Sequence, residues 1–125
     1  MPAIIFDVHA DQLRDFNLNL KWYTNKGYLV DLEGWGAYAE VRTVKDNTLV
    51  ARSTHSDNIV LHTDEGREGE IDLNFAAVDM DTEDLDCRYE LVMHPTAADP
   101  SSKPESIIRG LMKFRPKVAE PNPPD

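Results

Sequence analysis

Alternation of apolar and polar residues is the feature of this sequence that most restricts its fold. Residues 15–22 read Asp-Phe-Asn-Leu-Asn-Leu-Lys-Trp, so every second side chain is apolar. Successive side chains of a β-strand point to opposite faces, and such a segment therefore has one buried side and one side in solvent. The same argument, extended along the chain, predicts a core built from Phe16, Leu18, Leu20, Trp22, Ala39, Val41, Ile71, Leu73, Tyr89 and Leu91.

Short strand-like segments recur along the chain and are separated by turn-forming residues. They lie at residues 15–22, 29–32, 35–44, 48–52, 59–63, 71–75, 87–93 and 107–114. Asp46-Asn47 and the glycine-containing segment 64–70 are two of the turns between them. No segment repeats at a fixed period, which argues against a solenoid or propeller. Seven or eight short strands predict an all-β protein, and we expect an immunoglobulin-like antiparallel β-sandwich.

The segment 79–86 interrupts the alternation and is strongly acidic. We expect one helical turn here, capped by Asp79 or Asp81. Leu85 would then point inward. Calcium binding is the alternative, but the segment lacks the glycine and the ligand spacing of an EF-hand loop. A capped, solvated turn is the preferred interpretation.

The length of 125 residues corresponds to one domain. We expect the sandwich to occupy residues 1–114 and residues 115–125 to form an extended arm, because that stretch holds four of the eight prolines. Proline presets an extended backbone and removes a hydrogen-bond donor. We expect the arm to dock on a neighbouring subunit, with Phe114 and Val118 as its apolar anchors.

The charge of the chain excludes several classes of partner. There are 23 acidic and 13 basic residues, giving a net charge of −10. Binding to nucleic acid or to anionic lipid needs a surface rich in lysine and arginine. No apolar run approaches the ~20 residues of a transmembrane helix. We therefore expect neither nucleic acid nor a membrane among the partners.

No pattern in the sequence indicates catalysis, a metal or a cofactor. The four histidines do not fall at metal-binding spacings, and Cys87 has no second cysteine to support it. Cys87 falls in an alternating apolar row, which favours a role in core packing. Ser53, His55 and Ser56 are neighbours in a polar loop, which is weak support for a nucleophile and its base. We expect a protein that is not an enzyme and that has no catalytic, metal-binding or cofactor-binding residues.

Several aromatic residues cluster in one third of the chain. Trp22 and Trp35 fall on inward rows, so we expect them in the core. Tyr23, Tyr28 and Tyr38 fall off those rows and are the candidate residues for binding a partner, because tyrosine is common at interfaces. Ordinary half-exposed tyrosines of a sheet are the alternative interpretation.

Ordered segments of the chain resemble a group of small structural proteins from tailed bacteriophages, which carry an immunoglobulin-like sandwich. Residues 30–35 (VDLEGW) are similar to the family's VDLTGY, and residues 37–42 (AYAEVR) to its TARMQVR. Residues 88–92 (RYELV) are similar to YDLEL, and residues 107–110 (IIRG) to RLLxG. The resemblance extends over residues 3–115 and lies in the order of the segments. Two departures are the tryptophan that ends the first segment, where the family has tyrosine, and a longer, proline-rich loop at 95–104.

The resemblance implies a virion structural protein without catalytic residues. We expect it in the tail, baseplate or neck, bound to other virion proteins or to copies of itself and assembled in the host cytoplasm. A capsid decoration protein on the outer head surface is the alternative within this class. A carbohydrate-binding module, with Tyr23, Tyr28 and Tyr38 as a stacking platform, is the alternative from another class, and a small enzyme is the least supported.

Overall fold

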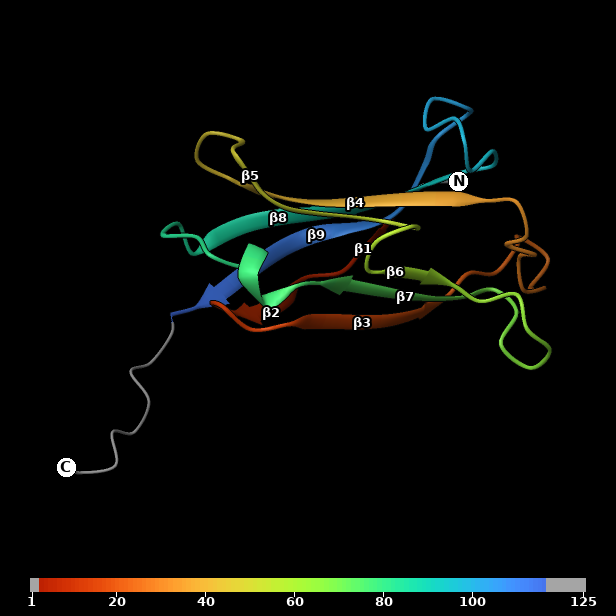
Figure 1. The fold of residues 1–125 in the computed structure, drawn as a ribbon, viewed down its shortest axis with the longest axis horizontal. Coiled ribbons are helices and arrows are strands. Elements are labelled where there is room, and N and C mark those ends of the chain that lie inside the picture. Colours follow the sequence, from red (N-terminus) through yellow and green to blue (C-terminus); the bar gives the residue numbers. More distant parts are fainter. Residues whose placement is uncertain (1–2, 117–125) are drawn as a thin grey trace.

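The computed structural model describes residues 3–116, which form a sandwich of two β-sheets (Figure 1). Its elements are β1 (Ile4–Ile5), β2 (Val8–Asp11), β3 (Phe16–Lys21), β4 (Gly36–Thr43), β5 (Leu49–Thr54), β6 (Ile59–Leu61), β7 (Glu70–Phe75), the 3₁₀-helix η1 (Ala77–Asp79), β8 (Asp86–His94) and β9 (Glu105–Arg115). No helix within this described range is long and apolar enough to cross a membrane.

The strand order is that of an immunoglobulin-like β-sandwich. The larger sheet has the order β1-β9-β8-β4-β5, with β2 also paired to β9, and the smaller sheet has the order β3-β7-β6. β4, β8 and β9 thus take the places of the central C, F and G strands of an immunoglobulin domain, and β3, β7 and β6 those of B, E and D. The predicted fold class is confirmed.

The predicted alternation sets the inner faces of both sheets. Ala39 and Val41 in β4, and Ile71 and Leu73 in β7, are completely or almost completely buried, as predicted. In β3, Asn17 and Asn19 face solvent. The remaining predicted core residues in β8, Tyr89 and Leu91, are also buried.

Burial decreases along β3, which differs from the prediction of a fully buried row. Phe16 is buried, but Leu18, Leu20 and Trp22 are only partly buried and pack against the margin of the core. The reason is that β3 is an edge strand of the smaller sheet. The Trp22 ring meets the edge of Trp35, with centroids 5.1 Å apart, which closes the core at this end.

The N-terminal segment departs from the expected antiparallel arrangement. β1 and β2 both pair with β9 in parallel, with Ile4 opposite Ile108 and Val8 opposite Met112. The two strands are two and four residues long. Strands so short contain no alternation long enough to read from sequence, so this pairing was not predicted.

The connection from β7 to β8 also differs in detail from the prediction. The helical turn is η1, which begins before Asp79 and has no side-chain cap at its own N-cap residue. Instead, a carboxylate oxygen of Asp15 accepts a hydrogen bond from the Ala77 amide at 2.8 Å. Leu85 is 37% exposed, so its predicted inward position was wrong; Met80 fills the core there and is fully buried.

The turns follow their sequence signals, with one exception. The Asp46-Asn47 turn is present between β4 and β5, and Asn47 has a positive φ of 61°. Thr43 and Thr48 hydroxyls both donate to the Asp46 carboxylate, which fixes the turn. The expected strand at 29–32 is absent and is replaced by a single bridge between Tyr23 and Leu29.

Candidate functional site

The candidate partner-binding tyrosines do not form one surface. Tyr23 and Tyr28 are 47% and 71% exposed on the loop between β3 and β4. Tyr38 lies in β4, is half-buried, and has the Arg52 guanidinium 4.7 Å from the centre of its ring. A ring covered by arginine on one face is not an open stacking platform. The ring contacts of the described residues join Tyr38 to His94 and not to either loop tyrosine.

The candidate anchors at the C-terminus are placed differently from the prediction. Phe114 is 4% exposed and belongs to the core of its own domain, so it is not an anchor on a neighbouring subunit. β9 continues to Arg115, one residue beyond the predicted end of the sandwich. Val118 and the rest of the predicted arm from residue 117 onward lie outside the described residues.

The loop with Ser53, His55 and Ser56 holds structural hydrogen bonds. The Ser53 hydroxyl donates to the Asn74 carbonyl and so links the two sheets. His55 Nδ1 lies 3.1 Å from the Ala37 amide nitrogen, and Ser56 contacts Thr54. Neither serine is hydrogen-bonded to the histidine in these contacts, so this loop shows no paired nucleophile and base.

Residues that bind metals elsewhere are dispersed here. Among residues 3–116, no group of three or more His, Cys, Asp or Glu side chains is arranged to hold a metal ion. Cys87 is fully buried, and burial raises the pKa of its thiol. A buried, protonated thiol is a poor nucleophile. The structure therefore assigns Cys87 to the core, as the alternating pattern predicted.

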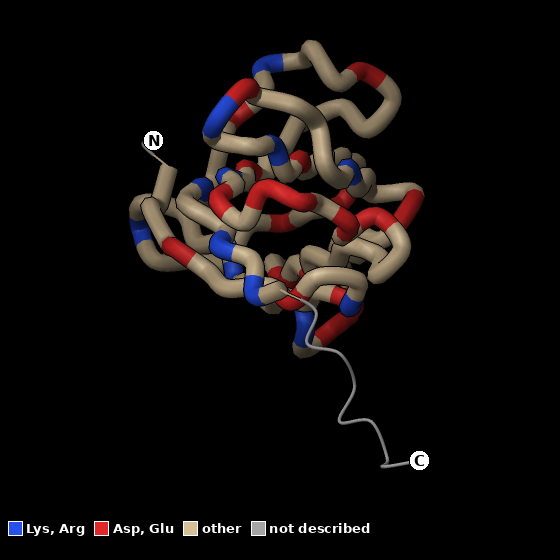
Figure 2. Tube along the Cα trace, turned by 90° about the vertical axis from the view of Figure 1, so that its left-hand side faces the viewer, with Lys and Arg blue, Asp and Glu red and all other residues tan. Residues whose placement is uncertain are grey.

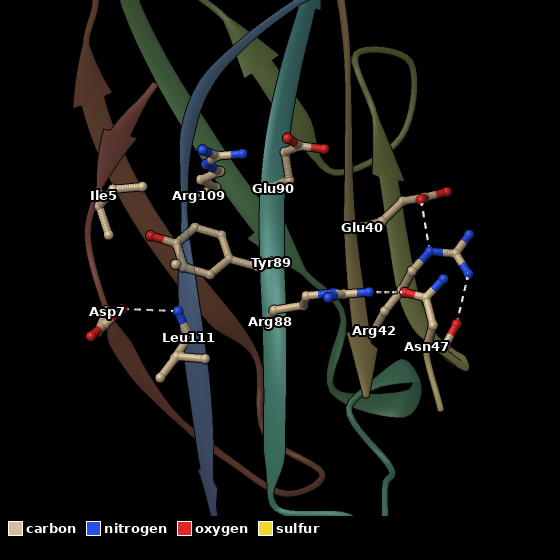
Figure 3. Close-up of a pocket in the computed structure, with 11 residues that line it drawn as sticks. Ile5, Asp7, Glu40, Arg42, Asn47, Arg88, Tyr89, Glu90, Arg109 and Leu111 are labelled. Carbon is tan, nitrogen blue, oxygen red and sulfur yellow. Dashed lines mark hydrogen bonds and ion pairs between the residues drawn. The ribbon is translucent and has the colours of Figure 1, made fainter. Parts of the chain in front are cut away.

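A hollow of about 700 Å³ lies on the outer face of the larger sheet. Figure 3 shows side chains from β1, β9, β8 and β4 lining it side by side. In Figure 1 the turn at 44–48 and the loop at 95–104 rise from the same side of this sheet, at its opposite ends. The hollow therefore lies on an open sheet face and is not a cleft between the two layers.

The hollow is lined by equal numbers of acidic and basic side chains. They are Asp7, Glu40, Glu90, Arg42, Arg88 and Arg109. The balance contrasts with the net charge of −10 for the chain. Figure 2 views one end of the sandwich, where acidic positions (red) and basic positions (blue) are interspersed. The charged side chains that line the hollow therefore sum to zero, whereas the whole chain is strongly acidic.

Cross-strand register orders these charges into two rows. Glu40 of β4 lies opposite Glu90 of β8, and two residues away Arg42 lies opposite Arg88. The acidic row continues outward to an arginine on each side. In the strand register, Glu90 lies opposite Arg109 of β9, and Glu40 lies opposite Arg52 of β5. The basic row continues to a leucine on each side, in the form of Leu111 and Leu49.

Ion pairs connect only part of this surface. The Glu40 carboxylate contacts Arg42 at 3.1 Å and also contacts Arg52. Arg88 donates to the side-chain carbonyl of Asn47, which is a neutral partner (Figure 3). Within the described part of the chain, the Glu90 side chain has no hydrogen bond or ion pair. Of the six charged side chains that line the hollow, only Glu40 and Arg42 are in ion pairs within the described residues; Asp7, Glu90, Arg88 and Arg109 have no opposite charge bound to them.

The rim of the hollow on the β1 side is apolar. Ile5 and Leu111 line it and are 64% and 39% exposed, and Ile4 and Phe6 beside Ile5 are 67% and 49% exposed. Asp7 holds this edge in place, because its carboxylate accepts a hydrogen bond from the Leu111 amide at 2.9 Å. Exposed apolar side chains next to arginines are typical of protein interfaces.

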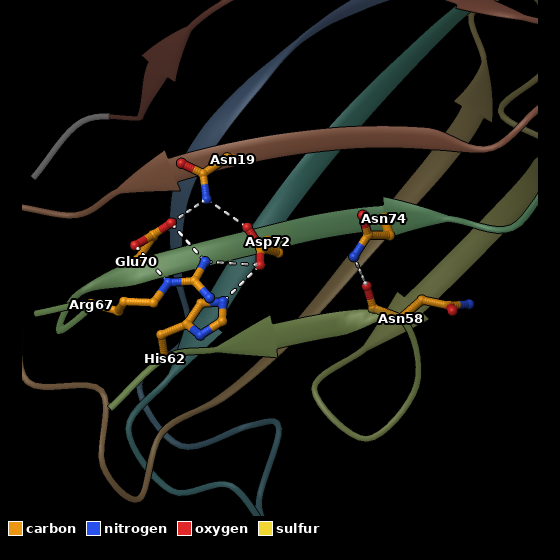
Figure 4. Close-up of polar contacts among 7 residues, drawn as sticks. All are labelled: Asn19, Asn58, His62, Arg67, Glu70, Asp72 and Asn74. Atoms are coloured by element: carbon orange, nitrogen blue, oxygen red, sulfur yellow. Dashed lines mark hydrogen bonds and ion pairs between the residues drawn. The ribbon is translucent and has the colours of Figure 1, made fainter. Parts of the chain in front are cut away.

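The outer face of the smaller sheet is polar and internally paired (Figure 4). Arg67 binds the Glu70 carboxylate through two nitrogens, at 2.9 and 3.2 Å. Asn19 donates to both Glu70 and Asp72, and His62 Nε2 lies 2.6 Å from the Asp72 carboxylate. These contacts hold the hairpin 62–69 against the sheet. Since the groups satisfy one another, this face offers less to a partner than the hollow does.

Comparison with known proteins adds one structural similarity. No family model matches the sequence, and no curated protein matches it. Among solved structures, the chain is similar to the extracellular domain of the voltage-gated sodium channel β4 subunit. The identity is 11%, 94% of this chain and 97% of that chain are covered, and the TM-score is 0.46. That domain forms parallel homodimers with a role in cell–cell adhesion. The fold assignment above rests on this chain's own strand order.

The sequence did not predict the hollow. Its charged residues could be recognised only as the polar, solvent-facing positions of alternating strands. Glu40 and Arg42, like Arg88 and Glu90, read as ordinary solvent-facing residues of two strands. Their arrangement depends on the pairing of β4 with β8, which lie about fifty residues apart in the chain. No local pattern encodes that register, so the two rows of like charge appear only in the folded domain.

Proposed function

We propose that this domain is a non-enzymatic structural component of a tailed-phage virion that binds neighbouring virion proteins in the tail, baseplate or neck. The observation that supports protein binding most directly is the hollow on the larger sheet, where three arginines lie beside an exposed apolar rim. Arginine and large apolar side chains are enriched at the centres of protein interfaces.

The virion context is supported by the order of the segments that resemble the phage proteins, from residues 30–35 to residues 107–110. The immunoglobulin-like sandwich is the fold that this resemblance implies. The placement of the tyrosines favours a protein partner over a carbohydrate, because Tyr38 is covered by Arg52 and its ring contact is with His94 and not with an exposed loop tyrosine.

The test is to locate the protein in purified particles. Tailed particles are prepared from a strain that carries the gene, banded on a density gradient, and analysed by quantitative mass spectrometry. We expect peptides of this chain in fixed proportion to the portal and tail proteins, and loss of infectivity when the gene is deleted. Complementation with the wild-type gene serves as the control. Particles of full infectivity that lack these peptides would overturn the proposal.

A second measurement separates the tail assignment from the capsid alternative. Particles carrying an epitope-tagged copy are labelled with antibody-bound gold and imaged by electron microscopy. Label at the tail, baseplate or neck supports the proposal. Label distributed over the head identifies a decoration protein and overturns the tail placement, while leaving the protein-binding role in place.

A further inference from the structure

The hollow on the outer face of the larger sheet offers a second copy a surface without net charge. Copies of a chain with a charge of −10 repel one another over most of their surfaces. The side chains that line the hollow have no net charge, because their acidic and basic members are equal in number. A self-contact here is therefore electrostatically easier than one through a surface with the average charge of the chain.

The four central charges of this face form a square. One side of the square is the acidic pair Glu40 and Glu90, and the opposite side is the basic pair Arg42 and Arg88. Each strand thus carries one acidic and one basic corner, with one inward-facing residue between them along the backbone. A second copy of this square is complementary to the first when it is turned so that its basic side lies over the acidic side of the first.

We propose that two copies of this domain bind face to face through the hollow, related by a two-fold axis that lies between the two facing sheets, parallel to them and perpendicular to the strands. This rotation exchanges the two rows. Glu90 of each copy then meets Arg88 of the other, and Glu40 meets Arg42. A two-fold axis parallel to the strands would instead place Glu40 over Glu90 and Arg42 over Arg88, which opposes like charges. The charge pattern therefore selects an antiparallel dimer.

Two of the side chains left without an opposite charge in one copy are paired by this dimer. Glu90 has no ion pair among the described residues, and Arg88 contacts only the neutral side chain of Asn47. Two-fold symmetry makes the contact between Glu90 and Arg88 twice in each dimer. The inference thus names the partner of the surface proposed above, and it rests on the protein-binding role but not on the virion placement.

The flanks of the square fit the same rotation. The acidic row ends in Arg109 and Arg52, and the basic row ends in Leu111 and Leu49. The rotation lays each arginine over the matching leucine of the second copy. Arginine stems are aliphatic and cover apolar side chains well.

The contact area predicts a weak dimer. Four strands spaced about 4.8 Å apart, each contributing about six residues at about 3.3 Å, cover roughly 400 Å² in each copy. The total of roughly 800 Å² is below the ~1,200 Å² of stable complexes. We expect the dimer to form at high local concentration, as where many copies stand side by side in one assembly.

Sedimentation equilibrium of the purified chain tests the proposal through a charge exchange. The wild-type chain and the variants Arg88→Glu and Glu90→Arg are measured alone and as an equimolar mixture, up to about 1 mM, where weak association is detected. Each variant alone opposes like charges twice in its homodimer, so we expect at least a tenfold weaker association. In the mixture, both contacts become attractive again, because one copy carries two acidic and the other two basic residues. We expect the association to recover to within about threefold of wild type.

Matched controls reverse charges away from the hollow. Lys21→Glu, on the exposed face of β3, changes the net charge as Arg88→Glu does, and Glu65→Arg, in the hairpin 62–69, matches Glu90→Arg. We expect both to associate like wild type. A wild-type chain that stays monomeric at the highest concentration would overturn the proposal, as would single variants that associate normally or a mixture that does not recover. Recovery in the mixture also shows that both variants are folded. None of these outcomes depends on finding the chain in a virion.

Discussion

The phenolic hydroxyl of Tyr89 donates a hydrogen bond to the main-chain carbonyl of Phe6, 83 residues earlier in the chain. Phe6 joins β1 to β2, the two short strands that extend the larger sheet in parallel beyond β9. Burial, and then the negative charge of Asp7, raise the pKa of Tyr89 to about 12, which keeps the donating hydroxyl protonated. This contact ties the N-terminal segment, which forms the apolar rim of the hollow, to a central strand.

Removing that hydroxyl is expected to loosen the N-terminal strands. In Tyr89→Phe the Phe6 carbonyl loses its donor while the ring still fills the core, so we expect a loss of about 1–2 kcal/mol in unfolding free energy. Hydrogen exchange should accelerate most at Ile4 and Ile5 and least in β7. Urea unfolding and exchange measured by mass spectrometry check both parts, and uniform acceleration across all strands would contradict a local role for the contact.

Gly110 allows the same segment to approach β9. A β-carbon added at Gly110 would lie 2.3 Å from the Phe6 carbonyl oxygen, and this neighbour is backbone that cannot move without breaking the parallel pairing. We expect Gly110→Ala to lower the unfolding free energy by about 2 kcal/mol or more, through strain in the close contact. Thermal unfolding monitored by circular dichroism measures the loss.

Ser106→Ala is the matched control for that substitution in the same strand. The Ser106 hydroxyl is buried and has no hydrogen-bond partner among the described groups. Its removal leaves no polar atom unsatisfied, so we expect stability equal to or slightly above that of wild type. A loss as large as that of Gly110→Ala would mean that β9 tolerates no change at all and that the close approach of Phe6 is not the cause.

The sequence predicts the strands and their inner faces well, because both depend on local alternation. It also contained the correct position of Phe114: Ile108, Met112 and Phe114 share one parity within a predicted strand, and all three are buried. Assigning Phe114 as an apolar anchor of the arm overlooked that pattern. The burial of a residue at the end of a strand is therefore predicted by the alternation along that strand and not by the composition of the segment that follows it.

Two other features could not be predicted from local patterns. The parallel pairing of β1 with β9 joins Ile4 to Ile108 across about one hundred residues, with only a two-residue strand as its signal. The helical turn before Leu85 begins at Ala77, whose amide is bound by the carboxylate of Asp15, a residue distant in sequence. In both cases a long-range contact determines the outcome.

Cys87 is expected to be unreactive in the native domain. Its side chain is fully buried, and the pKa of the thiol is raised, chiefly by burial. Both properties suppress the thiolate that thiol reagents attack. Labelling with a chromogenic disulfide at mildly alkaline pH should be slow in buffer and complete in denaturant. Rapid labelling of the folded chain would show that β8 opens locally.

The pairing of Glu70 with Arg67 and Asn19 should make stability depend on acid pH. The hydrogen bond from Arg67, followed by that from Asn19, lowers the pKa of Glu70 to about 2 from its usual 4.5. A carboxyl group whose pKa is lower in the folded state binds protons more readily when unfolded. Its contribution to stability is therefore complete above pH 4.5 and is lost as the pH falls toward 2.

Glu70→Gln removes this contribution, so we expect the variant to be less stable than wild type at neutral pH and the difference to shrink through this window. Asp72, whose pKa is also lowered, remains in both proteins and does not affect the comparison directly. Urea unfolding midpoints measured from about pH 7 to about pH 2.5 follow the difference. Glu65→Gln, an exposed change in the same hairpin, should run parallel to wild type throughout. A constant gap between Glu70→Gln and wild type across the whole range would show that the ion pair does not set the acid dependence.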